Sequence, residues 1–266
     1  MVVPGDTRKM LSTAKRIVVK IGTRSITDKS SKLDPEKVGK FVSDTMALRS
    51  LGIEVIVVSS GAIGAGVGRL NLNGRPEKMP ALQAAAAVGQ GILMQVYSKY
   101  FGEYQQPVAQ ILLTAEDFRN RRRYINFKNM LTGLMKWGVV PIVNENDSIA
   151  LEEIKMGDND ILSANVAIGA DADLLVILSD VKGIYMDYVN KSKRGKLINT
   201  VEKHTQVVTH VKSRGFGGML TKVVSAKMAT DKGIPVVVAG SAENMVLERI
   251  VEGKEVGTIF LPRKRK

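Results

Sequence analysis

Short apolar runs recur along the chain and are separated by longer stretches in which polar residues return every three or four positions. Fully apolar runs of this length, rich in Val and Ile, predict strands of a parallel sheet that is covered on both faces. A last, shorter run predicts one further strand. The predicted strands cover 16–21, 53–60, 107–114, 139–144, 174–180, 234–240 and 257–260.

The longer segments between these runs predict helices. The clearest start is Asp34 followed by Pro35, which are favoured at the N-cap and at the first helical position, and Gly52 is a typical helix end. The segment 80–102 is apolar on most sides, which predicts a buried helix. Further helices are predicted over 124–138, 161–171, 219–232 and 243–252.

Strands that alternate with helices predict an α/β fold with a mainly parallel central sheet. No internal repeat or linker divides the 266 residues, so we expect one continuous unit, which we interpret as two lobes. In sheets of this class, ligands bind beyond the carboxyl ends of the strands. No apolar run approaches the roughly 20 residues that a membrane span needs.

The chain carries a formal net charge of +13 and no cysteine. The missing cysteines exclude disulfides and thiolate metal sites, and they agree with a reducing compartment. A basic chain attracts anions such as nucleotides, carboxylates or nucleic acid. No aromatic stacking pattern is interleaved with the basic clusters. We interpret the tail cluster as solvated surface, and nucleic-acid binding stays open as the less favoured alternative. These clusters are Arg119 with 121–123, Lys191 with 193–196, and 263–266.

Glycines, hydroxyls, amides and a lysine follow the predicted strands, which indicates a cleft that handles phosphate. Lys20 lies near the end of an apolar strand, where an unpaired lysine is costly, although a lysine that snorkels to the surface is an alternative. Lys222 opens a helix after the glycine-rich segment 213–218. The other strand-end groups are Gly22, Ser59–Ala62, Asn144–Asp147 and Ser179–Asp180.

Two of these motifs have simpler explanations. The run GAIGAGVG (61–68) does not match the G-x-G-x-x-G spacing, and small residues for tight packing account for it nearly as well. In MGDNDILSAN (156–165), one of Asp158, Asn159 and Asp160 is expected to cap a helix that begins near Ile161. The surplus carboxylates of this region indicate a cationic group, either an ammonium or Mg²⁺.

Five segments together resemble the amino acid kinase family, in particular its members that phosphorylate glutamate. They are VVKIGT, VSSGAIGAG, VPIVNENDSIALEEIKMGDND, LSDVKGIY and GFGGMLTK, and the resemblance runs from about Arg16 to Phe260. It implies a three-layer α/β/α sandwich. It also implies transfer of a phosphoryl group from ATP, with Mg²⁺, to the side-chain carboxylate of L-glutamate, the first step of proline synthesis.

The resemblance assigns roles to individual residues. It makes Lys20, Lys222 and Asp160 the residues that carry catalysis, with Asp160 holding the two ammonium groups in place. Phe216 stands where the family usually has threonine, which removes a hydroxyl near the nucleotide. The ATP contacts are expected at Lys20, Gly22, Ser179, Asp180, Phe216, Gly217, Gly218, Met219, Leu220, Thr221 and Lys222. The glutamate contacts are expected at Ser60, Gly61, Ala62, Asn144, Asp147, Asp158 and Asn159.

The same resemblance sets expectations for the whole chain. We expect an N-terminal extension (1–15), a kinase domain (16–261) with an acceptor lobe (16–170) and a nucleotide lobe (171–261), and a basic tail (262–266) without the RNA-binding-like domain of many relatives. We further expect a cytoplasmic homo-oligomer, functionally coupled to the downstream glutamyl phosphate reductase. Another acceptor, such as aspartate, acetylglutamate or a phosphate, is the main alternative, and a nucleic-acid-binding regulator is the second.

Overall fold

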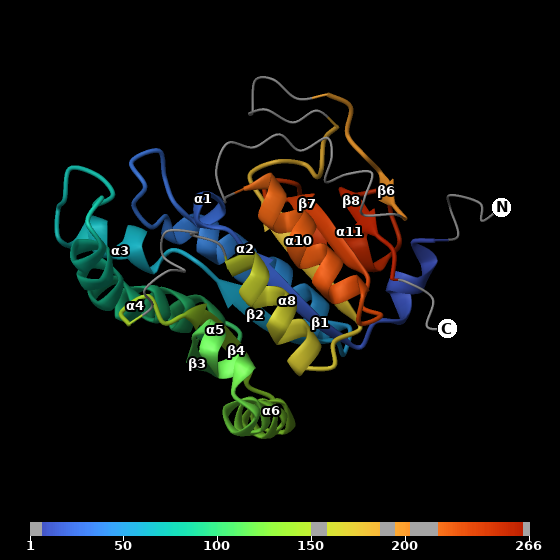
Figure 1. Cartoon of the computed structure of the whole chain (residues 1–266), viewed down its shortest axis with the longest axis horizontal. Coiled ribbons are helices and arrows are strands. Elements are labelled where there is room, and N and C mark those ends of the chain that lie inside the picture. The colour runs from blue at the N-terminus through green and yellow to red at the C-terminus, as the bar shows by residue number, and fades with distance from the viewer. Residues whose placement is uncertain (1–6, 150–158, 187–194, 203–217, 263–266) are drawn as a thin grey trace.

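The computed structural model describes residues 7–149, 159–186, 195–202 and 218–262, and these residues build one eight-stranded sheet. Its order is β3-β4-β2-β1-β5-β7-β8-β6, and all described pairings are parallel except β7 with β8 (Figure 1). The strands are β1 (Arg16–Ile21), β2 (Glu54–Ser59), β3 (Val108–Leu113), β4 (Val140–Glu145), β5 (Leu174–Ser179), β6 (Thr200–Val201), β7 (Val236–Gly240) and β8 (Thr258–Phe260).

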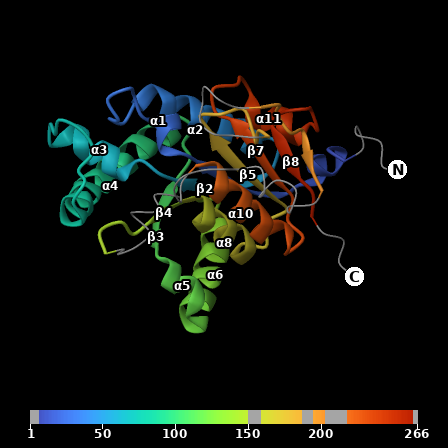
Figure 2. The ribbon, with the colours of Figure 1, turned by 45° about the horizontal axis from the view of Figure 1, so that its top comes forward.

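Helices cover both faces of the sheet, which gives three layers. The pair α8 and α10 lies side by side on one face, with α6 beyond them, and α2, α4 and α11 cover the other (Figures 1 and 2). The helices are α1 (Thr23–Ile26), α2 (Pro35–Ser50), α3 (Ala62–Arg69), α4 (Met79–Gly102), α5 (Ala115–Arg119), α6 (Arg121–Lys136), α8 (Asn159–Gly169), α10 (Met219–Thr230) and α11 (Val246–Val251), after a 3-10 turn at Lys9–Thr13.

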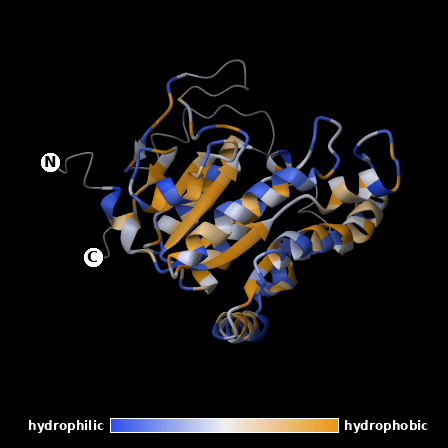
Figure 3. Cartoon of the chain, turned by 180° about the vertical axis from the view of Figure 1, so that it is seen from behind, coloured by the Kyte–Doolittle hydropathy of each residue, from blue (hydrophilic) through white to orange (hydrophobic). Residues whose placement is uncertain are grey.

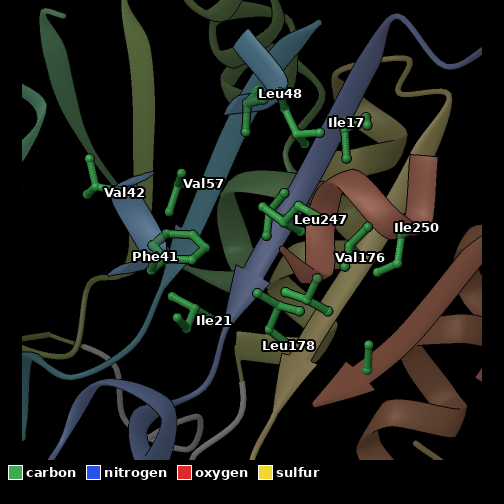
Figure 4. Close-up of a cluster of buried hydrophobic side chains, with 14 of the residues drawn as sticks. Ile17, Ile21, Phe41, Val42, Leu48, Val57, Val176, Leu178, Leu247 and Ile250 are labelled. Atoms are coloured by element: carbon green, nitrogen blue, oxygen red, sulfur yellow. The ribbon is translucent and has the colours of Figure 1, made fainter. Parts of the chain in front are cut away.

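The central strands are hydrophobic along nearly their whole length, as Figure 3 shows, because both of their faces are buried. In β1 the side chains of Ile17, Val19 and Ile21 enter the core under α2 and α11, of which Figure 4 shows a part. Val18 enters the opposite core, under α8 and α10. Because side chains alternate along a strand, Lys20 lies on the same face as Val18.

The predicted three-layer α/β/α architecture and its mainly parallel sheet are confirmed. Each predicted strand is present within about two residues, and Asp34 caps α2 by accepting hydrogen bonds from the backbone of Glu36 and Lys37, at 3.2 and 3.3 Å. Two features differ from the expectation. The last strand, β8, is antiparallel to β7, and the two-residue strand β6 had no signal in the sequence.

The glycine-rich run after β2 is a helix, α3, and its glycines allow α3 to lie directly against α4. A Cβ atom on Gly66 would come within 1.9 Å of the Ala85 carbonyl oxygen, and one on Gly89 within 1.8 Å of that of Ala62. Two backbones therefore touch where any side chain would clash. Close helix packing, the simpler of the two explanations, accounts for these positions. No helix in the described part of the chain combines the length and apolar character needed to cross a membrane.

Candidate active site

Two lysines and one aspartate meet at the carboxyl end of β1, on the face covered by α8 and α10. Lys20 Nζ lies 2.5 Å from one carboxylate oxygen of Asp160, and Lys222 Nζ lies 3.0 Å from the other. Thr221 donates a hydrogen bond to the second oxygen at 3.2 Å. We call Lys20, Asp160, Thr221 and Lys222 the ionic cluster. The two ammonium groups are held apart by the width of one carboxylate.

The charged groups of the ionic cluster are buried, which is unusual for a set of side chains with a net positive charge. Asp160 has no exposed surface, and Lys20 and Lys222 are only 4 and 7% exposed. Two positive groups share one negative group, so the three side chains carry a net charge of +1 away from bulk water. Asp160 lies in the first turn of α8, where the helix dipole favours a negative charge. A buried positive excess of this kind attracts an anion such as a phosphate.

The turn at the start of α10 positions Lys222 next to Asp160. Gly218 precedes the helix with φ +82° and ψ −114°, a backbone conformation that favours glycine. Its carbonyl oxygen accepts hydrogen bonds from Thr221 at 3.0 Å and from Lys222 at 3.3 Å. The turn thereby directs both side chains toward Asp160. Of the other expected nucleotide contacts in this segment, Met219 is buried and Leu220 half-buried, and Phe216 and Gly217 lie outside the described residues.

A second buried polar cluster lies next to the first and consists of side-chain amides. Asn159 donates to the Ser59 carbonyl oxygen and to Asn144 Oδ1, both at 2.7 Å, and lies 3.1 Å from Ser60 Oγ. Asn144 in turn donates to Gln90 Oε1 at 2.9 Å, and Gln90 donates to Gln110 Oε1 at 3.1 Å. We call Asn159, Asn144, Gln90 and Gln110 the amide chain.

The remaining expected contacts border these clusters without a described bond to them. Ser179 lies at the end of β5 and contacts Asp180 at 3.3 Å, and Asp180 pairs with Arg24 at 3.4 Å. The Gly22 N–H is already used by the Leu178 carbonyl oxygen at 3.3 Å. Gly61 has φ +109° and leads into α3, which begins at Ala62.

Asp147 follows β4 and is half-buried. Burial raises the pKa of its carboxyl from the usual 3.8 to about 6, and the positive charge of Arg75 opposes this change only in part. Asp158, a further expected contact, lies outside the described residues. The described part of α8 starts at Asn159, so Asn159 and Asp160 lie within the helix, whereas the sequence had offered either of them as its cap. Their side chains are directed into the two clusters.

Gln90 and Tyr97 belong to this region but were not expected from the sequence. Both lie on α4, two turns apart, and Tyr97 shares a 2.8 Å hydrogen bond with the Ser59 hydroxyl. The predicted helix 80–102 also contains Gln83 and Gln95, so the sequence alone did not single out Gln90. Within the described residues, no group of three or more carboxylate or imidazole side chains gathers to hold a metal ion.

Comparison with known proteins places the chain in a class. The model of the amino acid kinase family matches residues 15–240. The chain belongs to the amino acid kinase family. Its fold is also that of a carbamate kinase from Giardia lamblia bound to AMP-PNP (TM-score 0.67, 16% identity, 94% of this chain and 99% of that one). A UMP kinase from Bacillus anthracis has the same fold (TM-score 0.62, 15% identity, 94% of this chain and 96% of that one).

Three relatives with higher sequence identity are glutamate 5-kinases. A glutamate 5-kinase from Dictyoglomus thermophilum is 49% identical over 254 residues, which are 94% of this chain and 68% of that protein. One from Caldanaerobacter subterraneus is 46% identical over 254 residues, with the same coverage. A glutamate 5-kinase from Clostridium acetobutylicum is 44% identical over 262 residues, which are 97% of this chain and 98% of that protein.

Proposed function

We propose that the protein is a glutamate 5-kinase, which transfers the γ-phosphoryl group of ATP to the side-chain carboxylate of L-glutamate. The product is L-glutamyl 5-phosphate, and the reaction is the first step of proline biosynthesis. The single observation that carries the chemistry is the ionic cluster, in which Asp160 holds Lys20 and Lys222 on its two oxygens. The choice of glutamate is supported by relatives of that name at 44–49% identity.

The reaction brings together two anions, a carboxylate and a polyphosphate, so charge is its main obstacle. A carboxylate oxygen of glutamate forms a bond to the γ-phosphorus while the bond from that phosphorus to the oxygen of ADP breaks. Such a transfer needs in-line positioning and fixed cations more than covalent help. In the proposal, Lys20 and Lys222 approach the moving phosphoryl group from two sides, and Asp160 keeps them apart without touching the substrates.

The nucleotide would be used as its Mg²⁺ complex. When bound, the ion would add positive charge at the phosphates and would need few protein ligands. This agrees with the described residues, in which both oxygens of Asp160 are occupied by lysines. On the acceptor side, Asn159, Ser60 and Asp147 are proposed to hold glutamate, with Asp147 paired to its ammonium group.

A hydroxylamine trap tests this function, because acyl phosphates react with hydroxylamine to give hydroxamates and phosphate monoesters do not. We expect a hydroxamate to form only when ATP, Mg²⁺ and L-glutamate are all present. Aspartate, N-acetylglutamate, carbamate and UMP serve as parallel acceptors. A phosphorylated product from one of those four, with none from glutamate, would overturn the assignment.

Four further expectations accompany this function as proposals. They are the division into an acceptor lobe (16–170) and a nucleotide lobe (171–261), a homo-oligomeric state, a cytoplasmic location and functional coupling to a glutamyl phosphate reductase. The coupling to the reductase has a chemical reason, since an acyl phosphate is a reactive product that water hydrolyses. Rapid use by the next enzyme limits that loss.

A further inference from the structure

The amide chain crosses the molecule from the candidate active site to the edge of the sheet. It begins at Asn159 on α8, continues through Asn144 at the end of β4 and Gln90 on α4, and ends at Gln110 on the edge strand β3. Every link is a donation from the NH₂ group of one amide to the oxygen of the next. Gln110 is exposed, whereas Asn159, Asn144 and Gln90 are 8, 1 and 9% exposed.

Two backbone groups fix the direction of this chain. The backbone N–H of Glu145 donates to Asn144 Oδ1 at 2.9 Å, so the oxygen of that amide must face it. The Ser59 carbonyl oxygen accepts from Asn159 at 2.7 Å, so the nitrogen of that amide must face it. A backbone donor and a backbone acceptor cannot exchange roles. Asn144 therefore directs its NH₂ group to Gln90, which has to offer an oxygen.

This direction decides which atom of Asn159 is left for a ligand. An amide NH₂ group has two hydrogens, and the two 2.7 Å bonds use both, with Ser60 Oγ sharing one at 3.1 Å. Within the described part of the chain, Asn159 Oδ1 accepts no hydrogen bond. The group left over is a pure acceptor, which suits a ligand that donates hydrogen bonds, such as an ammonium.

We propose that Gln90 is a positioning residue for the acceptor site: by accepting from Asn144, it sets the amide direction that presents Asn159 Oδ1 to the ammonium group of the substrate. The inference rests on the proposed function and names the part of glutamate that this amide selects. Gln90 does not itself touch the substrate. Its replacement leaves the Asn144 NH₂ group without its buried partner, and the Asn144 amide then loses the contact that holds it against rotation.

The test compares three variants with the parent enzyme. Gln90→Met keeps the length of the side chain and removes the acceptor, and Gln90→Glu restores an oxygen that faces Asn144. Gln95→Met is the matched control, because Gln95 is exposed on the same helix. For Gln90→Met we expect the glutamate KM to rise about five- to tenfold, with the ATP KM unchanged. For Gln90→Glu and Gln95→Met we expect a glutamate KM within about twofold of the parent.

Glutarate separates positioning from general packing, because it is glutamate without the ammonium group. As a competitive inhibitor, glutarate should keep its Ki in Gln90→Met. An equal loss of affinity for glutarate and glutamate would overturn the inference, and so would an unchanged glutamate KM in Gln90→Met. If that variant does not fold, Gln90→Glu decides alone, since a tenfold rise of its glutamate KM contradicts the proposal. Absence of glutamate-dependent turnover in the parent enzyme would instead overturn the proposed function, and this inference with it.

Discussion

Asn159 and Asp160 are neighbours in the chain and in the first turn of α8, but their side chains enter two different kinds of buried cluster. Asp160 joins the ionic cluster, in which two full positive charges share one negative charge. Asn159 joins the amide chain, in which every group is neutral and each bond has a direction set by its neighbours. One helix start thus serves both halves of the site.

The difference between the clusters lies in what each does with a ligand. A buried net charge of +1 is costly in the free protein and is relieved when a phosphate enters. A chain of amides that are all hydrogen-bonded costs little free energy to bury. Its role is to orient a donor or an acceptor toward the ligand. We therefore expect changes in the ionic cluster to alter turnover and stability strongly, and changes around the amide chain to alter the affinity for glutamate.

The largest effect is expected for Asp160→Asn. This change leaves two lysines in a buried place without their shared counterion, and removing one partner of a buried ionic group typically costs about 3–5 kcal/mol of unfolding free energy. Urea unfolding measures the loss. MgATP should raise the Tm of the variant more than that of the parent, because its phosphates replace the missing negative charge.

The exposed pair of Lys128 and Asp171 supplies the control for that experiment. Its two atoms lie 2.8 Å apart, but the Asp171 side chain is 72% exposed. Asp171→Asn should lower the unfolding free energy by at most about 1 kcal/mol. Equal losses in the two variants would mean that burial does not distinguish the ionic cluster from a surface ion pair.

The next effect is on turnover and concerns the two lysines. Lys222→Ala should lower kcat by about 10²–10³ and leave the ATP KM nearly unchanged, because its charge acts mainly as negative charge shifts in the transition state. Lys20→Ala should behave similarly. The double variant should lose less than the product of the two single losses if both ammonium groups act on one phosphoryl group.

Lys227 is the matched control, because it lies on the same helix and pairs with Asp231 at 2.7 Å near the surface. Steady-state kinetics of Lys227→Ala should give the kcat of the parent. A folded Lys222→Ala enzyme with normal kcat would show that the ionic cluster is structural and that the phosphoryl group is held elsewhere.

Asp147 tests the acceptor side of the site, where glutamate is proposed to bind. Asp147→Ala should weaken glutamate by about 1.5–3 kcal/mol, the value of a hydrogen bond to a charged group, and leave the ATP KM unchanged. A raised ATP KM with an unchanged glutamate KM would place Asp147 beside the nucleotide.

The pH profile sharpens that test. Because burial raises the pKa of Asp147 to about 6, the carboxylate that pairs with an ammonium is lost as pH falls through 6. The glutamate KM should rise in that range, and Asp147→Asn should remove this part of the profile. The stability of the folded protein depends on pH in the opposite way to the binding of glutamate. The fold holds the Asp147 proton between about pH 4 and 6, where the unfolded chain releases it, so this group makes the protein less stable as pH rises through that window.

Whether a feature of the fold or the site could be predicted from the sequence depends on whether its interactions are local or connect residues far apart in the chain. The strands and most helices follow from local patterns, and the positions of Lys20, Asp160 and Lys222 follow from the strand ends and from the family motifs. The antiparallel direction of β8 and the presence of the short β6 depend on partners distant in the sequence, and no local signal indicates either of them. Gln90 was missed for the same reason: α4 contains three glutamines, and only the packing of α4 against β3 and β4 identifies Gln90 as the one that bonds to Asn144 and Gln110.

Tyr97→Phe is expected to give the smallest effect and marks the outer limit of the acceptor site. Tyr97 is fully buried, and its hydroxyl contacts Ser59 at 2.8 Å, one residue before Ser60. The Ser59 hydroxyl also donates to the Ser60 carbonyl oxygen at 3.0 Å, so it keeps a partner when the tyrosine oxygen is removed. We expect a loss of about 0.5–1.5 kcal/mol in unfolding free energy and a glutamate KM within about twofold of the parent. A tenfold rise of the glutamate KM without a loss of stability would extend the positioning role of α4 from Gln90 to Tyr97, and would show that the neutral half of the site is set by this helix at two points.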